Sequence, residues 1–156
     1  MYKKVISVLL VVLLICSLAA CGKGQTETPV DIESLQKEIE AADLFIDTFV
    51  SVDANVLSSV MYLATDDIEE FMVYMGSGYT AEEYGVFRCI SEETASELVE
   101  RLRVRVDAQK AIYLDYAPDA MPRLNNAVIK QQGSAVAYVV AEKYGDALKI
   151  VEKYIK

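Results

Sequence analysis

The longest apolar stretch of the chain runs from Val5 to Ala20 and contains only two serines as polar residues. It is shorter than the roughly 20 residues that a membrane-spanning helix needs. Two lysines precede this stretch, and it ends in small residues. A basic start, an apolar middle and small residues before a cleavage site are typical of a secretory signal. We therefore predict a signal peptide over residues 1–20.

The end of this stretch, Leu18-Ala19-Ala20-Cys21, resembles the bacterial lipobox. In lipoproteins with this motif, the cysteine receives a diacylglycerol and becomes the new N-terminus. Two acyl chains hold a protein stably on a bilayer, at about 0.8 kcal/mol per buried methylene. We expect lipid attachment at Cys21, and through this anchor a location on the outer face of the cytoplasmic membrane. The alternative is an ordinary signal peptide cut after Ala20, with Cys21 incidental.

The residues after Cys21 are polar and predict a flexible tether, so that the lipidated cysteine and tether together occupy residues 21–30. Random-coil scaling gives the stretch from Gly22 to Pro29 a span of roughly 16 Å. The tether would therefore hold the following domain close to the bilayer. We expect residues 31–156 to form a single extracytoplasmic domain.

Apolar residues spaced three and four apart predict helices along this domain. The first follows the N-cap Asp31 and carries an apolar stripe as far as Ile46. A long helix follows the N-cap Ser91 and must end near Ala117, because Pro118 disfavours helix in the residue before it. The expected helices cover residues 32–46, 54–64, 92–117 and 145–155, with a turn and one more short helix within 118–127.

Residues 68–75 fit either a helical stripe or a strand alternation. Their short length and the glycine turn that follows favour a strand. Residues 83–90 are rich in aromatic and β-branched residues and predict its partner strand. Residues 128–130 and 135–141 flank another glycine turn and predict a second hairpin. We therefore expect an α+β fold, with a mainly antiparallel four-stranded sheet of two hairpins and helices on one of its faces.

Acidic residues outnumber basic ones, with 24 Asp and Glu against 15 Lys and Arg. Removal of the signal takes away Lys3 and Lys4 and no acid, which leaves 13 basic residues and a net charge of −11. A surface of this charge repels nucleic acid. We expect no nucleic-acid partner.

The chain has no histidine, which excludes Ser-His and Cys-His catalysis and zinc sites with histidine ligands. Of its three cysteines, only Cys89 remains once the signal is removed and Cys21 is modified. We expect Cys89 to be a small buried apolar residue, with no disulfide. The residues thus indicate no catalytic set, no metal site and no cofactor.

Two acidic residues precede the second predicted strand. Glu82 and Glu83 point to opposite faces, because neighbouring strand residues alternate, so they cannot act together. Glu83 shares its face with residues that look buried, and a buried carboxylate needs a partner. Arg105 is our candidate. The pair is either a structural ion pair or a ligand carboxylate and base.

Two further groups have a structural and a functional interpretation. The acidic run at residues 66–70 lacks the alternating ligands and the glycine of a calcium loop, which favours a solvated loop leading into a strand. Tyr113 and Tyr116 fall on the inward face of the long helix, which favours a place in the core. An aromatic surface for peptide or glycan could come from four other residues: Tyr79, Tyr84, Tyr138 and Tyr144.

Several short motifs within residues 60–150 resemble one family of bacterial lipoproteins. They are Tyr79-Thr-Ala-Glu-Glu-Tyr-Gly-Val-Phe-Arg88, Arg105 with Gln109 four residues later, Tyr116-Ala-Pro118, Asn126-Ala-Val-Ile129, and Gly133 before a hydrophobic strand. The family is catalogued as domain of unknown function 4358 and occurs mostly in Gram-positive, Firmicutes-type bacteria. The resemblance implies a small extracytoplasmic domain and no particular activity. It also implies a shared surface at the matching residues Glu83, Arg105, Gln109, Tyr116 and Pro118.

Two functions fit these features. The first is a non-enzymatic module that binds an envelope protein or a cell-wall component. The second is a cell-envelope enzyme with Glu83 as base and Arg105 as anion binder. An exposed Glu83 in a cleft would favour the enzyme, and a sealed pair would favour the binding module. A small-solute receptor is disfavoured, because such receptors close two lobes around the ligand.

Overall fold

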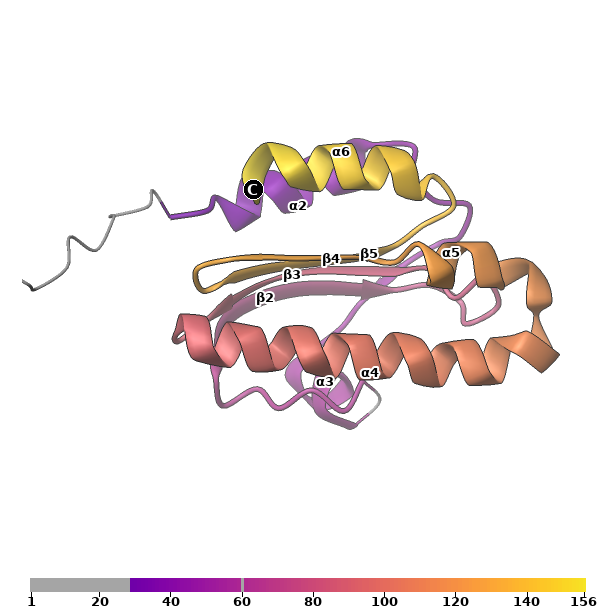
Figure 1. Cartoon of the computed structure of the whole chain (residues 1–156), viewed down its shortest axis with the longest axis horizontal. Helices are drawn as coiled ribbons and strands as arrows, with labels where there is room; N and C mark the ends of the chain where they lie inside the picture. Colours follow the sequence, from indigo (N-terminus) through magenta and orange to yellow (C-terminus); the bar gives the residue numbers. More distant parts are fainter. Residues whose placement is uncertain (1–28, 60) are drawn as a thin grey trace, which may run out of the picture.

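The computed structural model describes residues 29–59 and 61–156. Within them, five strands form one antiparallel sheet in the order β1-β2-β3-β5-β4, and helices cover both of its faces (Figure 1). The strands are β1 (Val50–Ser51), β2 (Ile68–Met75), β3 (Glu83–Cys89), β4 (Val128–Gln132) and β5 (Ala135–Val140). The helices are α2 (Ile32–Ala41), α3 (Ala54–Ser59), α4 (Glu92–Tyr116), the 3₁₀ helix η1 (Pro118–Ala120), α5 (Met121–Asn125) and α6 (Tyr144–Tyr154). The predicted signal peptide, Cys21 and the tether up to residue 28 lie outside the described residues.

The α+β class and the antiparallel sheet are confirmed, whereas the predictions of four strands and of one covered face are wrong. The extra strand β1 pairs Val50 with Met75 and Ser51 with Tyr74 at the edge of the sheet. Two residues are too few to produce a periodic signal in the sequence. The second covered face carries α2 and α6, which lie side by side above the sheet, while α4 crosses the other face (Figure 1).

The ambiguous stretch at residues 68–75 forms a strand, as predicted. β2 pairs antiparallel with β3, from Ile68 opposite Cys89 to Met75 opposite Glu83. The second hairpin is also present, although β4 extends to Gln132 and is longer than predicted. The two hairpins join through an antiparallel pairing of β3 with β5, so both belong to one sheet.

The two faces of the sheet bury separate groups of apolar side chains. Phe87 and Tyr138 point toward α4, whereas Tyr84, Val86 and Val139 point toward α2 and α6. Successive strand residues alternate between the faces. Because helices cover both faces, the central strands are buried along most of their length.

The first helix is capped by Asp31, whose side chain accepts a hydrogen bond from the Ser34 N–H at 2.9 Å. It ends at Ala41, so the prediction that it reaches Ile46 is wrong. The chain turns to an extended conformation at Ala42, and Ile46 is 63% exposed. The Glu82 side chain accepts hydrogen bonds from the backbone N–H groups of Ile46 and Asp47 and holds this segment out of the helix. The helix α3 is likewise shorter than the predicted 54–64.

The long helix α4 begins with a capping box, in which Ser91 and Thr94 each bond to the other's backbone N–H. It ends before Pro118, as predicted. Tyr113 is buried in the core as expected, but Tyr116 is 64% exposed, which contradicts its predicted inward position. The last turn of α4 runs past the end of the sheet (Figure 1), so the sheet cannot cover that side chain.

Candidate functional site

Glu83 and Arg105, which were predicted to form a pair, are in direct contact. Glu83 is the first residue of β3, and Arg105 lies in the middle of α4. The Arg105 Nε donates to Glu83 Oε1 at 2.7 Å, and Nη2 donates to Oε2 at 2.6 Å. Only 3% of the Glu83 side chain and 11% of the Arg105 side chain are exposed. The two side chains therefore form a buried ion pair with the two-pronged geometry that suits arginine and carboxylate.

Tyr138 on β5 completes this buried cluster. Its hydroxyl donates to Glu83 Oε1 and lies 3.5 Å from Gln109 Oε1. Tyr138 is fully buried. Burial raises the pKa of Tyr138 well above its usual value, and the charge of Glu83 adds to the effect. The hydroxyl is therefore held as a proton donor to the carboxylate.

The charge on Arg105 is stabilised in the same cluster. Burial acts to lower the pKa of Arg105, but the hydrogen bond and the charge of Glu83 outweigh it, so the pKa is raised. Both oxygens of Glu83 accept hydrogen bonds from buried groups. This arrangement fixes the positions of β3, β5 and α4 relative to one another and keeps the Glu83 carboxylate away from solvent.

The neighbouring Glu82 is also buried, at 2% exposure, which was not predicted. Its Oε2 accepts from the backbone N–H groups of Ile46 and Asp47, each at 2.9 Å, and its Oε1 accepts from the Glu142 N–H at 2.8 Å. The Arg123 Nε lies 3.7 Å from the same Oε1. Glu82 and Glu83 accept these hydrogen bonds from different residues, which fits the alternation of neighbouring strand residues between the two faces. The only sequence signal for the contact of Glu82 with Ile46 and Asp47 was the acidic pair at the start of a buried strand.

A fixed loop connects β2 to β3 across residues 76–82. Asp47 Oδ2 accepts hydrogen bonds from the Ser77 N–H at 3.0 Å, the Ser77 hydroxyl at 2.8 Å and the Thr80 hydroxyl at 2.6 Å. The Tyr113 hydroxyl donates to the Gly78 carbonyl at 2.5 Å. Partial burial acts to raise the pKa of Asp47, but these hydrogen bonds outweigh it and lower the pKa. The loop is thus anchored from both the α2–β1 segment and α4.

The backbone of this loop is strained at Ala81, which has φ +61°. Few residues other than glycine adopt this conformation, and such strain gathers at functional sites. A Cβ added at Gly76 would approach Asp47 Oδ2 to 2.7 Å and the Glu82 carbonyl to 2.8 Å. The loop therefore requires glycine at this position.

Tyr79 lies at the tip of the anchored loop and faces a hollow of about 330 Å³. Tyr116 lines the same hollow, and these two tyrosines are 69% and 64% exposed. The remaining lining residues are Ile46, Thr80, Ala117, Pro118, Asp119, Ala120 and Arg123. We name this feature the Tyr79–Tyr116 hollow. Its volume is at the lower end of sites that hold small molecules, which run from about 300 to 1,000 Å³.

The predicted shared-surface residues therefore divide between two places. Glu83, Arg105 and Gln109 belong to the buried cluster, whereas Tyr116 and Pro118 line the Tyr79–Tyr116 hollow. The prediction of an aromatic surface is wrong for two of its four tyrosines. Its members Tyr84 and Tyr138 are buried, because they lie on central strands covered on both faces, while Tyr79 and Tyr144 are exposed.

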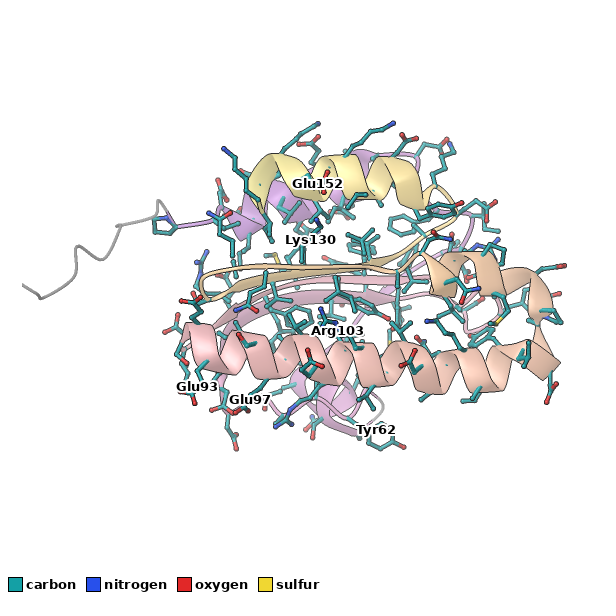
Figure 2. The ribbon with its side chains drawn as sticks, in the orientation of Figure 1. Tyr62, Glu93, Glu97, Arg103, Lys130 and Glu152 are labelled. Carbon is teal, nitrogen blue, oxygen red and sulfur yellow. The ribbon has the colours of Figure 1, made fainter. Side chains whose placement is uncertain are left out.

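A second concave surface runs along the outer side of α4. This groove has a volume of about 430 Å³ and is walled on one side by Met61 and Tyr62. Figure 2 shows Tyr62 below α4, with Glu93 and Glu97 near the start of the helix. Arg105 and Gln109 also line the groove, so it passes directly over the buried cluster.

The structure offers little for metal or thiol chemistry in its described part. Residues 29–59 and 61–156 contain no group of three or more Cys, Asp and Glu side chains arranged to hold a metal ion. Cys89 is buried as predicted, and burial raises the pKa of its thiol to about 11. The acidic run 66–70 forms a turn and the exposed start of β2. Cys21, the predicted lipid site, is not among the described residues.

Residues 46–141 match the family described as domain of unknown function (DUF4358), and the chain belongs to this family. The match includes the buried cluster, the anchored loop and every lining residue of the Tyr79–Tyr116 hollow. Comparisons with curated proteins and with solved structures found no match. No helix within the described ranges has both the length and the apolar character needed to cross a membrane.

Proposed function

We propose that this protein is a lipid-anchored, non-enzymatic binding module on the outer face of the cytoplasmic membrane. Its Tyr79–Tyr116 hollow binds a component of the cell envelope. The observation that carries this proposal is the sealing of Glu83. A general base needs a free position within hydrogen-bond reach of the proton it takes, and the Glu83 oxygens are occupied by Arg105 and Tyr138.

The hollow has the features of a recognition site. Two exposed tyrosines frame it, and tyrosine supplies a large contact area with only two rotatable side-chain bonds. Hydrogen bonds that the Asp47 carboxylate accepts and one that the Tyr113 hydroxyl donates hold the loop that carries Tyr79. A loop fixed before the ligand arrives loses less entropy on binding. A sugar or a short peptide segment of the cell wall matches the size and the aromatic walls of the hollow.

The anchoring part of the proposal rests on the sequence pattern around Cys21. Labelling of growing cells with a radioactive fatty acid tests it directly. The unaltered chain should take up label and sediment with membranes, and Cys21→Ala should abolish both. Cys16→Ala is the matched control, because it changes another cysteine of the same segment and should leave labelling intact. Labelling that survives Cys21→Ala would contradict the anchor.

Ligand binding is tested by thermal shift of the full-length chain in mild detergent, with cell-wall fragments, sugars and short peptides. A ligand at a hundred times its Kd adds about 2.7 kcal/mol of stability. Tyr79→Ala and Tyr116→Ala should remove the shift, whereas Tyr144→Ala, which changes an exposed tyrosine outside the hollow, should preserve it. A flat response to the whole panel would contradict the hollow as a site for small envelope components. If the protein converts a ligand chemically and Glu83→Gln abolishes that conversion, the result would support the alternative function as a cell-envelope enzyme.

A further inference from the structure

The outward face of α4 carries a row of five side chains whose spacing along the helix is symmetric about the central residue. Arg101, Val104, Ala108, Ile112 and Asp115 follow one another at intervals of three, four, four and three residues. Residues three and four apart lie on one face of a helix. We name this set the α4 stripe. Ala108 is at its centre, one apolar residue stands on each side, and the two ends carry opposite charges.

The α4 stripe is exposed although most of it is apolar. Val104 is 70% and Ile112 is 62% exposed, while Ala108 and Asp115 are also at the surface. Val104 and Ile112 lie two turns apart with Ala108 on the turn between them, and exposed apolar side chains on one face of a helix indicate a surface that packs against a partner. The groove walled by Tyr62 runs beside the α4 stripe and provides room for the side chains of a second helix.

The charges at the ends of the α4 stripe determine which partner fits. Within the described residues, Asp115 makes no ion pair, and Arg101 reaches Glu97 only at 3.9 Å. If a second α4 packs antiparallel with the two Ala108 residues facing each other, each Arg101 meets Asp115 of the second copy. Val104 then meets Ile112 of the second copy. A two-fold axis makes every such contact twice, as in other symmetric dimers.

The central alanine allows the two helices to approach closely. Helix axes pack 8 to 10 Å apart, with the smaller distances at small side chains. Because the Cα atoms lie about 2.3 Å from the helix axis, the facing Ala108 Cα atoms would be about 3.4 to 5.4 Å apart. Glu97 lies one turn before Arg101 in α4. By the same symmetry, the position opposite Glu97 falls after Tyr116, the last residue of the partner's α4. Glu97 therefore faces no residue of the partner's α4.

We propose that two copies of this protein associate through antiparallel packing of their α4 stripes. One pair of helices makes a small interface, below the about 1,200 Å² of most stable complexes. The dimer is therefore weak and reversible. The proposal is independent of the function assigned to the Tyr79–Tyr116 hollow, which is lined by other residues.

Disulfide trapping at the axis of the dimer tests this geometry. Ala108→Cys is introduced into the full-length chain in mild detergent, and disulfide-linked dimer is measured after mild oxidation. At the longer of these separations the facing Cα atoms lie within the 4.4 to 6.8 Å that a disulfide spans, so several-fold more linked dimer is expected than from the unaltered chain. Glu93→Cys is the matched control. It is exposed on the same side of α4 but lies about 22 Å from Ala108 along the helix. Equal linkage from the two variants would overturn the proposal.

Charge reversal distinguishes a second copy from any other partner. Arg101→Asp alone and Asp115→Arg alone each place like charges at both ends of the interface. Each should raise the dimer Kd, measured by sedimentation equilibrium, by about tenfold. The double variant Arg101→Asp with Asp115→Arg restores opposite charges across the two-fold axis and should recover the original Kd. A double variant no better than the single ones would overturn the antiparallel pairing.

Discussion

The Glu83–Arg105–Tyr138 cluster and the Tyr79–Tyr116 hollow are built from the same parts of the chain and use them in opposite ways. Each combines the β2–β3 region with α4, and each contains residues of the motifs that resemble the family. In the cluster, the polar atoms bond to one another and are sealed. In the hollow, the polar groups fix the loop and leave two tyrosines exposed. Under the proposed function, a motif residue therefore supports the fold where it is buried and contacts the ligand where it is exposed.

Breaking the buried ion pair is expected to have the largest effect on stability. Arg105→Met leaves Glu83 as a buried charge without its main partner, which costs about 3 to 5 kcal/mol. Urea unfolding measures the loss. Replacing both residues, Glu83→Leu with Arg105→Met, should recover most of it, since a buried pair can often be exchanged for apolar residues.

The control for this prediction is an ion pair of similar length at the surface. Lys37 and Glu33 lie 2.6 Å apart, and both side chains are 66% exposed. Glu33→Gln should change the free energy of unfolding by less than about 0.5 kcal/mol. A loss at Glu33 as large as that at Arg105 would show that burial is not what distinguishes the cluster.

Removal of the Tyr138 hydroxyl should have a smaller effect. Tyr138→Phe keeps the packing of the ring and deletes one buried hydrogen bond to a charged carboxylate, at a cost of about 1.5 to 3 kcal/mol. The same urea experiment measures it. In the Glu83→Leu, Arg105→Met background the hydroxyl has lost the carboxylate and keeps only the long contact to Gln109 Oε1 at 3.5 Å, so Tyr138→Phe should then cost much less. If Tyr138→Phe lowers stability equally in that background, the hydroxyl contributes through a contact other than the one to Glu83.

The anchored loop should make stability depend on pH through Asp47. Hydrogen bonds lower the folded-state pKa of Asp47 below its usual value of 3.8. Its contribution is therefore present above the unfolded pKa and is lost as pH falls through the folded pKa. Asp47→Asn should lower stability at pH 7 by about 1 kcal/mol and should flatten the decline between pH 5 and 2. Unfolding midpoints measured across this range check the sign, and an unchanged decline in the variant would contradict it.

The exposed tyrosines should contribute least to stability. Tyr79→Ala lies at a loop tip and should change the free energy of unfolding by less than about 0.5 kcal/mol, while binding at the hollow is lost. Thermal unfolding with and without ligand separates the two quantities. A large loss of stability without ligand would mean that Tyr79 supports the fold, and the contrast between cluster and hollow would fail.

Local pattern was enough to predict most elements and one long-range contact. The glycine turns, the cap at Ser91 and Pro118 act within a few residues, so their effects on β2, β3 and α4 could be predicted. The pairing of Glu83 with Arg105 also followed, because a carboxylate on a buried strand face requires a cation. The early end of α2 did not follow, since it depends on Glu82 binding the backbone of Ile46 and Asp47, and no periodicity records such a contact.

The amino-acid sequence alone therefore determines the antiparallel α+β class, the two hairpins and the need for an internal partner at Glu83, because these depend on spacing and on the cost of burying charge. Only the tertiary structure decides that the sheet has five strands with both faces covered, since β1 exists through its pairing with β2. It also decides that Tyr138 is sealed while Tyr79 and Tyr116 stay exposed. The physical reason is that the burial of a side chain depends on which helix covers it. The position of that helix is set by packing between segments far apart in the chain.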